Sequence, residues 1–261
     1  MFALFLTILL AVIVFVWIVI FINLNDFSIK TTRDIPFKKI LVTFPHPDDE
    51  IFTCGGFIKK TAKQGADTTL LLFTKGEKGT TDAHREHILR KIRTKEGKRS
   101  GKILGYKKVI VKDFGDGLLS QKKQRMAIYF EKLLAKENFD LVITYDLSGL
   151  YGHEDHMALS RVVTDAVNKH ERAKLWYASP NRKFISKIKL PEHMAKSPTF
   201  KKLRTAPTLK IFIGGQITSK IKAFYAHRSQ MQTLGSGRPF KPSPKWFYLS
   251  TLLFEYFYEV N

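Results

Sequence analysis

Two short clusters of histidine and acidic residues have the side chains best suited to chemistry. Residues 45–50 read PHPDDE, and residues 152–156 read GHEDH. Each cluster follows an apolar run that predicts a buried β-strand, Lys39–Phe44 before the first and Phe139–Tyr145 before the second. In open α/β sheets, ligands bind in the crevice beyond the carboxyl ends of the strands. We therefore expect the two clusters to meet at one edge of a sheet.

The residue types in these clusters are those that bind a divalent metal ion. Two imidazoles and one carboxylate suit Zn²⁺ and leave a fourth position for water. His46 and Asp49 are three residues apart in a turn restrained by Pro47, so both can face one point. His156, at the start of a predicted helix, can complete the set. The sequence thus predicts a metal site at His46, Asp49 and His156, with zinc as the expected ion and Fe²⁺ as an alternative.

The remaining residues of the clusters could perform acid–base chemistry. A metal ion lowers the pKa of bound water, and an adjacent carboxylate can then take its proton. Asp48 lies next to a predicted ligand but is itself free, so it is the expected general base. His153, one turn before His156, could donate a proton to a developing oxyanion or a leaving amine. Asp155 could fix the tautomer of that histidine or raise its pKa.

Histidines three residues apart are weak evidence by themselves. Residues 84–87 read HREH and have the same spacing, but no predicted strand precedes them, so we expect a solvated helix start. The acidic run at residues 48–50 could likewise be ordinary helix N-terminal charge. The metal-site prediction depends on two such clusters, each following a strand.

Alternating strands and helices must position these clusters. Further strands are predicted at Thr68–Thr74, Lys107–Val111, Leu175–Ala178 and Leu209–Ile213. Helices are predicted at Gly56–Gln64, Asp82–Leu104, Ser120–Lys136, Asp155–Lys169 and Ser219–Leu234. Strands separated by helices imply parallel βαβ units. The expected fold is α/β, with an open, mostly parallel, doubly wound (Rossmann-like) sheet that has helices on both faces.

The first 23 residues are predicted to be a transmembrane anchor. Thr7 is the only polar residue between Met1 and Phe21, and about twenty apolar residues match the thickness of a bilayer. A cleavable signal peptide would have a basic start and a small-residue cleavage site, neither of which is evident. Four basic residues follow the span closely, which predicts a cytoplasmic catalytic domain. We expect an anchor at 1–23, a linker at 24–37 and one domain at 38–261.

Composition limits the class of protein. The chain has 261 residues, 44% of them hydrophobic, which suffices for a packed core and argues against disorder. A single cysteine, Cys54, excludes an intrachain disulfide and a cysteine-based zinc cluster.

The net charge of +21 indicates that the protein binds a negatively charged partner. No nucleic-acid reading motif accompanies it, so nucleic acid is not expected and anionic lipid headgroups are the simpler partner. The basic segment Arg172–Arg204 is hypothesised to flank the site and face the membrane or an anionic substrate; general solubility with docking to lipid is the alternative. Lys245–Val260 is strongly aromatic and predicts a packed terminal helix, with a membrane-surface contact as the alternative.

Several motifs occur in an order that resembles a known family. They are PHPDDE, GG, IRTKE followed by LGY, DG, GHEDH and AHRSQ. Together they resemble the LmbE/PIG-L family of zinc-dependent N-acetylglucosaminyl deacetylases, from Lys39 to the C-terminal region.

The resemblance implies a role for each matching position. It implies zinc ligation by His46, Asp49 and His156, with Asp48 as general base. It implies that His153 assists as an acid or oxyanion partner and that Asp155 supports it. Sugar contacts are implied for Arg93 in the IRTKE motif and for Asp116 in the DG motif.

The expected function is hydrolysis of the N-acetyl group of a GlcNAc-containing glycoside or glycolipid, with release of acetate and a free amine. Two alternatives stay open. Two histidines and one carboxylate can also hold Fe(II) for oxygen chemistry. A membrane-tethered, non-catalytic sugar or lipid binder is the other.

Overall fold

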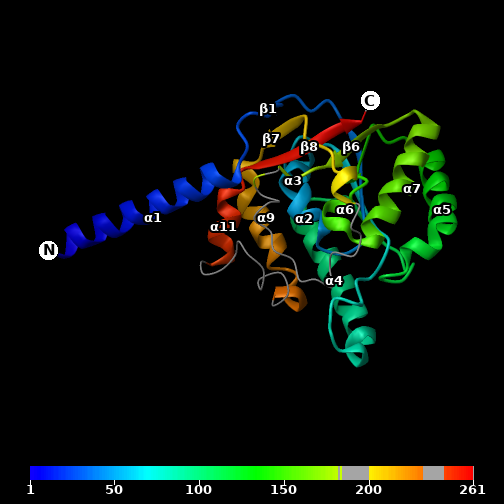
Figure 1. Ribbon diagram of the computed structural model, residues 1–261, viewed down its shortest axis with the longest axis horizontal. Coiled ribbons are helices and arrows are strands. Elements are labelled where there is room, and N and C mark those ends of the chain that lie inside the picture. Colours follow the sequence, from blue (N-terminus) through cyan, green and yellow to red (C-terminus); the bar gives the residue numbers. More distant parts are fainter. Residues whose placement is uncertain (182, 184–199, 232–243, 261) are drawn as a thin grey trace.

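The computed structural model describes residues 1–181, 183, 200–231 and 244–260. Within them, eight strands form one sheet in the order β1-β7-β8-β6-β5-β2-β3-β4 (Figure 1). The strands are β1 Lys30–Thr31, β2 Lys39–Phe44, β3 Asp67–Leu72, β4 Lys108–Val111, β5 Leu141–Tyr145, β6 Lys174–Ala178, β7 Leu209–Phe212 and β8 Phe254–Val260. β8 pairs antiparallel with β6 and β7, and the other pairs are parallel. The expected mostly parallel α/β sheet is confirmed.

Helices cover both faces of this sheet. The α-helices are α1 Phe2–Leu24, α2 Asp49–Thr53, α3 Gly55–Lys63, α4 Glu86–Leu104, α5 Lys123–Lys136, α6 Gly149–Gly152, α7 Glu154–His170, α9 Ile217–Phe224 and α11 Lys245–Thr251. Short 3₁₀ helices are η1 Ala83–Arg85, η2 Leu119–Lys122, η4 Phe200–Leu203, η5 Gly214–Gln216 and η6 Arg228–Gln230.

The core divides into two layers because strand side chains alternate between faces. Ile40, Val42 and Phe44 of β2 pack on the side of α3, α4 and α9. Leu41, between them in sequence, packs on the side of α5 and α7. Helices on both faces bury the central strands completely, which explains why these strands read as continuous apolar runs.

The chain reverses its direction of winding between β2 and β5. From β2 it proceeds outward through β3 to β4, and it then returns to β5 and continues to β6 on the other side. β2 and β5 lie side by side and are parallel. Such a switch point opens a crevice at the carboxyl edge of a sheet. Both sequence clusters leave the sheet at this edge.

The C-terminal segment differs from the helix predicted for Lys245–Val260. Only α11 is helical, and β8 then fills the space between β6 and β7. Phe257 joins the core on the α9 side, while Tyr258 packs on the α7 side, which is the alternation of a strand. The prediction was wrong because aromatic content alone does not separate helix from strand. Backbone pairing with two distant strands decides the outcome.

Two further sequence expectations change in extent. The helix predicted for Ser219–Leu234 ends at Phe224 as α9, and a separate 3₁₀ helix follows. The expected linker 24–37 contains β1, which pairs with β7.

Most of the basic segment Arg172–Arg204 lies outside the described residues, so its hypothesised position beside the site stays a prediction.

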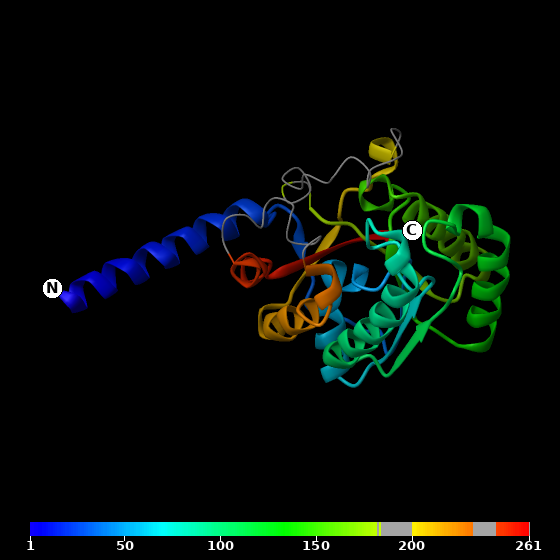
Figure 2. The same cartoon turned by 90° about the horizontal axis from the view of Figure 1, so that it is seen from below.

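α1 projects away from the domain (Figures 1 and 2). It is long and apolar enough to cross a membrane, and the same features also occur in signal sequences near an N-terminus. Its end is tied to the domain: Asn25 Nδ2 donates to Thr251 O at 2.8 Å, and Asn181 Nδ2 donates to Leu24 O at 3.0 Å. Asn181 lies beyond β6, at the carboxyl edge of the sheet.

Candidate metal centre

The first cluster turns sharply as it leaves β2. Asp48 has a φ of +109°, a left-handed conformation that is strained for a residue with a side chain. The turn lets Asp49 begin α2 and fold back, so that its Oδ2 accepts the backbone N–H of His46 at 2.9 Å. The strained turn thus places His46, Asp48 and Asp49 of the PHPDDE cluster together at the sheet edge.

The second cluster follows β5 through a kinked segment. Leu150 has a φ of +68°, and Gly149 and Gly152 also have positive φ values. A Cβ on Gly149 would lie 2.8 Å from the backbone nitrogen of Met157, so only glycine fits there. His153 then caps the N-terminus of α7.

The three predicted ligands converge across the switch point. His46 Nδ1 and His156 Nε2 are 3.2 Å apart. Asp49 Oδ2 lies 3.5 Å from His46 Nδ1, and Asp49 Oδ1 lies 3.5 Å from His156 Nε2. All three side chains are buried. The ring nitrogens of His46, His153 and His156 also lie within 4.8 Å of one another, so His153 borders the same point.

Hydrogen bonds on the far sides of the two rings indicate their tautomers. His46 Nε2 lies 2.9 Å from Asp116 Oδ1 and 3.2 Å from Asp155 Oδ2, so it carries a proton. His156 Nδ1 donates to Gly149 O at 3.2 Å. When both rings are neutral, the nitrogens that face each other therefore present lone pairs, beside a carboxylate. This arrangement favours a cation between them, and a histidine held by a carboxylate is a common metal ligand.

The separations also suit a divalent ion. Metal–ligand bonds of about 2.0–2.1 Å in a tetrahedron place neighbouring ligand atoms about 3.3–3.4 Å apart. The observed separations of 3.2, 3.5 and 3.5 Å are close to that value, and the two Asp49 distances end on different oxygens of its carboxylate. His46, Asp49 and His156 therefore offer the donor types that a zinc-type ion takes, at separations near those of a metal site.

The electrostatics of the cluster favour positive charge at this point. Burial lowers the pKa of His46, but the carboxylates of Asp116, Asp155 and Asp49 outweigh it, and the pKa lies well above the ordinary value. Burial together with His46 lowers the pKa of His156 to about 4, even though Asp49 acts in the opposite direction. The carboxylates of Asp49, Asp116 and Asp155 favour a positive charge at this point, and either a proton or a metal ion can supply it.

Asp48 lies beside this point with the properties of a base. Burial raises its pKa to about 7, against the opposing effect of the Arg93 guanidinium. Arg93 Nη2 donates to Asp48 Oδ2 at 3.0 Å. A carboxylate that titrates near neutral pH is well matched to general-base chemistry.

The residues expected to contact a sugar bind the protein itself. Arg93 donates to Gly76 O at 2.8 Å and Pro47 O at 2.6 Å, besides Asp48. Asp116 bonds His46, as described above, and its Oδ2 accepts the backbone N–H of Lys78 at 2.8 Å. In this structure, Arg93 braces the first cluster and Asp116 orients His46. A role for either in binding sugar stays a prediction.

The Asp155 carboxylate supports a different histidine from the one expected. Besides His46, it accepts the backbone N–H groups of Gly117 at 2.6 Å and Leu119 at 2.9 Å. Its link to His153 is through the backbone: Asp155 N donates to His153 Nδ1 at 3.2 Å. The reason is that Asp155 lies in the first turn of α7, where its side chain points back toward the sheet edge.

His153 is held as a neutral donor. Because its Nδ1 accepts a backbone N–H, the proton of the neutral ring resides on Nε2. Burial, with His156 and His46 nearby, lowers the pKa of His153 to about 3. The ring stacks on that of His156 with centroids 4.6 Å apart. The site therefore offers a carboxylate base and a neutral N–H donor beside a cation-binding point.

Comparison with known proteins agrees with this arrangement. The family model described as PIG-L, GlcNAc-PI de-N-acetylase, matches residues 41–167, a segment that contains both clusters. The match covers 127 of the 261 residues, so this segment is similar to the PIG-L family. The expected resemblance is confirmed.

Proteins similar to this chain include named deacetylases. It is 40% identical over 134 residues to a diacetylchitobiose deacetylase of Thermococcus kodakarensis, an alignment that covers 50% of the chain and 49% of that protein. It is 26% identical over 231 residues to a 1D-myo-inositol 2-acetamido-2-deoxy-α-D-glucopyranoside deacetylase of Saccharomonospora viridis, which covers 74% and 85%. The chain thus spans about half the length of the first relative and most of the second.

A solved structure shares the fold. The N,N'-diacetylchitobiose deacetylase from Pyrococcus horikoshii superposes with a TM-score of 0.63 at 23% identity, covering 86% of this chain and 84% of that one. The two proteins therefore share the fold over most of this chain.

Other residues of the candidate site were not found from the sequence. Tyr145 OH donates to Asp49 Oδ1 at 2.9 Å, and Glu50 Oε2 accepts the backbone N–H of Asp48 at 3.2 Å. Ser100 in turn donates to Glu50 at 2.9 Å, and burial raises the pKa of Glu50 to about 8. Tyr145 is the last residue of a predicted strand that precedes the second cluster. Its position at the end of that strand could have identified it as a residue of the site.

His227, in the AHRSQ motif, is fully buried, and both its ring nitrogens have no hydrogen-bond partner among the described residues. Burial, with Arg93 nearby, lowers its pKa to about 3, and Asp49 acts on it in the opposite direction. The motif is recognisable in the sequence, but its spacing predicts no role for the histidine.

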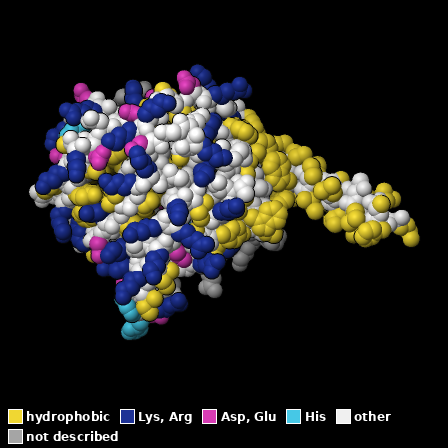
Figure 3. All heavy atoms as spheres, turned by 180° about the vertical axis from the view of Figure 1, so that it is seen from behind, with side chains coloured by type: hydrophobic (Ala, Val, Ile, Leu, Met, Phe, Trp, Pro, Cys, Tyr) yellow, Lys and Arg dark blue, Asp and Glu magenta, His cyan; other side chains and the backbone are white. Residues whose placement is uncertain are grey.

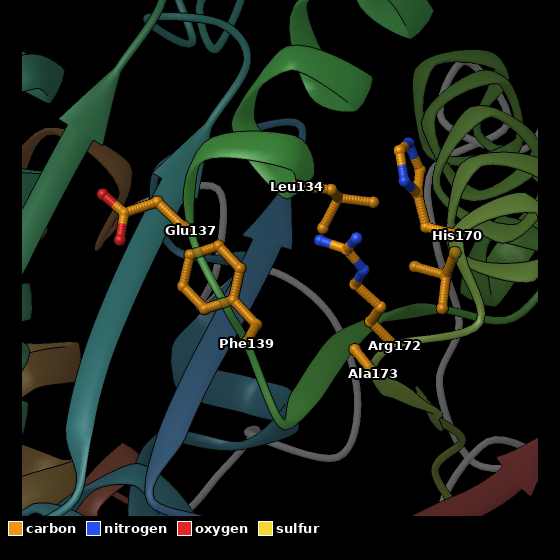
Figure 4. A pocket seen from close by; sticks show the side chains of 7 residues that line it. Leu134, Glu137, Phe139, His170, Arg172 and Ala173 are labelled. Atoms are coloured by element: carbon orange, nitrogen blue, oxygen red, sulfur yellow. The ribbon is translucent and has the colours of Figure 1, made fainter.

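A concavity elsewhere on the PIG-L fold is separate from the metal centre (Figure 4). It is lined by Leu134, Glu137, Phe139, Val167, His170, Arg172 and Ala173. These residues precede β5 and β6 or end α5 and α7, so they lie at the amino edge of the sheet. Ligands of this fold class bind at the opposite edge.

Proposed function

We propose that this protein is a metal-dependent N-deacetylase that removes the acetyl group from a GlcNAc-containing glycoside or glycolipid. The observation that carries the proposal is the convergence of two imidazole rings and one carboxylate beside a second carboxylate whose pKa is about 7. The PIG-L match over both clusters supports it, and so do the names of the relatives.

His46, Asp49 and His156 would hold the ion, with zinc as the proposed metal. Once bound, a divalent ion supplies Lewis acidity that lowers the pKa of water and polarises an amide carbonyl. Asp116 and Asp155 would keep His46 oriented with Nδ1 toward this point. Tyr145 would do the same for Asp49.

The proton transfers belong to Asp48 and His153. Asp48 takes a proton from the attacking water as the water oxygen bonds to the acetyl carbon. His153 Nε2–H donates to the carbonyl oxygen as it gains negative charge. The carbon–nitrogen bond then breaks, and the proton on Asp48 passes to the departing nitrogen. The products are acetate and the free amine of the sugar.

We further propose that α1 anchors the enzyme in a membrane, with residues 38–261 as a cytoplasmic catalytic domain. The support is the apolar length of α1 and the basic residues Lys30, Arg33, Lys38 and Lys39 that follow it.

Acetate release from a panel of GlcNAc conjugates tests the function. The panel contains GlcNAc linked to a second GlcNAc, to inositol, to malate and to phosphatidylinositol. We expect turnover of at least one conjugate, its loss after treatment with a chelator, and its recovery when Zn²⁺ is restored. Turnover that persists without metal contradicts the metal role. Oxygen-dependent turnover supports the Fe(II) alternative, and binding without turnover supports a tethered binder.

A further inference from the structure

α11 lies across the direction of α1 on the face from which α1 projects. It runs beside the base of α1 in Figure 1 and is seen nearly end-on in Figure 2. A side-chain bond joins the two helices, because Trp17 Nε1 donates to Ser250 Oγ at 2.8 Å. Trp246 lies one turn before Ser250 on the same side of α11, and it is 51% exposed.

Aromatic rings extend this apolar surface onto the domain. Phe21 of α1 lies 5.5 Å from Phe27 and 6.5 Å from Phe254, measured between ring centroids. Phe254 lies 5.5 Å from Phe212. Phe27 is 50% exposed and Phe212 is 48% exposed. Figure 3 shows hydrophobic side chains continuing from α1 onto the adjoining face, which Lys and Arg side chains border.

The length of the apolar run sets the depth of this surface in a bilayer. α1 has 23 residues and is about 34 Å long at 1.5 Å per residue, against about 30 Å of hydrocarbon. A run centred in the bilayer leaves only about one residue outside at each end. Trp17, which contacts α11, lies seven residues before Leu24, about 10 Å along the helix axis. The level of α11 is therefore within the apolar boundary of the membrane.

We propose that Trp246 of α11, together with Phe27, Phe212 and Phe254, forms a lipid-facing seat that embeds the domain in the bilayer interface. The proposal rests on the proposed anchoring by α1. The occupant is a lipid bilayer because the seat continues the surface of α1 and lies perpendicular to it, as an interfacial helix does. Aromatic side chains favour this depth, and such helices bury their apolar face about 5–10 Å into the headgroup boundary.

Charge distinguishes a bilayer from a second copy of the chain. A protein of net charge +21 with a cationic border around the seat repels its own copy and attracts anionic headgroups. Lys210 lies beneath the rings and is buried: its Nζ is 5.1 Å from the ring centroid of Phe27 and 4.8 Å from that of Phe254, and it donates to Asp26 O at 2.7 Å.

Site-directed fluorescence in proteoliposomes tests the seat. The sole native cysteine, Cys54, is buried, so a polarity-sensitive label can be placed at one introduced cysteine in the full chain. Trp246→Cys reports the seat. Ile128→Cys is the matched control, because Ile128 is an apolar residue that is 49% exposed on α5, far from α1. Val12→Cys reports α1. The vesicles contain phosphatidylcholine, phosphatidylglycerol and nitroxide lipids labelled near the headgroup or near the chain end.

We expect the nitroxide near the headgroup to quench the label at residue 246 at least about twofold more strongly than it quenches the label at residue 128. This difference is expected because the apolar face of an interfacial helix lies about 5–10 Å into the headgroup boundary. The label at residue 12 should be quenched more by the chain-end nitroxide. Equal quenching at 246 and 128, with residue 12 quenched, overturns the seat alone. An unquenched residue 12 overturns both anchor and seat.

A disulfide between two Trp246→Cys chains without lipid quenching assigns the face to a second copy and also overturns the seat. Acetate release by the same labelled proteins reports the proposed catalytic function separately.

Discussion

At the scale of single residues, Asp48 combines backbone strain with a functional side chain. Its φ of +109° is of the kind that costs about 1–3 kcal/mol and persists where the surroundings determine it. Arg93 and Glu50 provide those surroundings, since Arg93 bonds the side chain and Glu50 accepts the backbone N–H. The strain is localised at the proposed base.

Asp48→Asn should separate catalysis from metal binding. The amide keeps the shape of the side chain but cannot take a proton, so we expect acetate release to fall about 10²–10⁴-fold while bound zinc stays near one per chain. Elemental analysis of the purified variant checks the metal. Asp49→Asn is the control and should lose both metal and turnover. Loss of metal from Asp48→Asn would reassign that residue as a ligand.

His227 should make the fold sensitive to mild acid. Its pKa is about 3 in the folded protein against 6.5 for an ordinary histidine, so the unfolded chain binds a proton that the folded chain does not. Stability is fully present above pH 6.5 and is lost as the pH falls below it. Between pH 6.5 and 5 the loss due to His227 is about 2 kcal/mol, at about 1.4 kcal/mol per unit.

His227→Gln removes this proton linkage. Urea unfolding in detergent at the two pH values should show a smaller acid-induced loss of unfolding free energy than the parent by about that 2 kcal/mol. His84→Gln, at an exposed position, should behave like the parent. An identical pH dependence in His227→Gln and the parent would contradict the prediction.

The sequence predicted the residues of the site better than their contacts. His46, Asp49 and His156 were found because each is a ligand type that follows a strand. Tyr145 and Glu50 were missed because their roles depend on bonds to Asp49 and Asp48 that no local pattern encodes. Likewise, Asp155 was paired with its near neighbour, whereas folding brings its carboxylate to a histidine 109 residues away.

At the scale of elements, a buried ion pair joins three parts of the fold. Lys220 Nζ of α9 lies 2.6 Å from Glu255 Oε1 of β8, and both side chains are almost fully buried. The same carboxylate accepts the backbone N–H groups of Gly56 and Phe57 at the start of α3. This carboxylate therefore holds the inserted strand β8 against two helices.

Lys220→Met should destabilise the protein by about 3–5 kcal/mol, because Glu255 is left buried without its cation. Lys220→Met combined with Glu255→Gln should be less destabilised than Lys220→Met alone. Lys107→Met breaks an exposed pair with Asp67 and should change stability by less than about 1 kcal/mol. Chemical unfolding of the four proteins checks the order, which would be contradicted if the double variant were the least stable.

Elements inside the parallel sheet were predicted well, since helices on both faces make each strand a continuous apolar run. β2 begins and ends where expected. β8 was missed because its aromatic run directly follows α11 and also suits a helix, and because it pairs antiparallel with both of its neighbours. Its place between β6 and β7 depends on two strands that lie 76 and 42 residues or more earlier in the chain.

At the scale of the whole molecule, the anchor and its orientation can be tested together. Membranes that contain the full chain should retain it after carbonate extraction, at its full mass of 30.1 kDa. In inside-out vesicles, added protease should digest the domain, because the positive residues after α1 favour the cytoplasmic side. A shortened mature chain would show that α1 is a cleaved signal, and protection of the domain would reverse the orientation.

The bonds from Asn25 and Asn181 to the base of α1 have a consequence for how such an enzyme meets its substrate. A flexible tether would let the domain tumble and sample the surrounding solution. Here the join is stiff, and Asn181 lies at the same sheet edge as the metal centre. With α1 anchored as proposed, the reaction would be held at a fixed height above one leaflet, and the search for substrate would become two-dimensional.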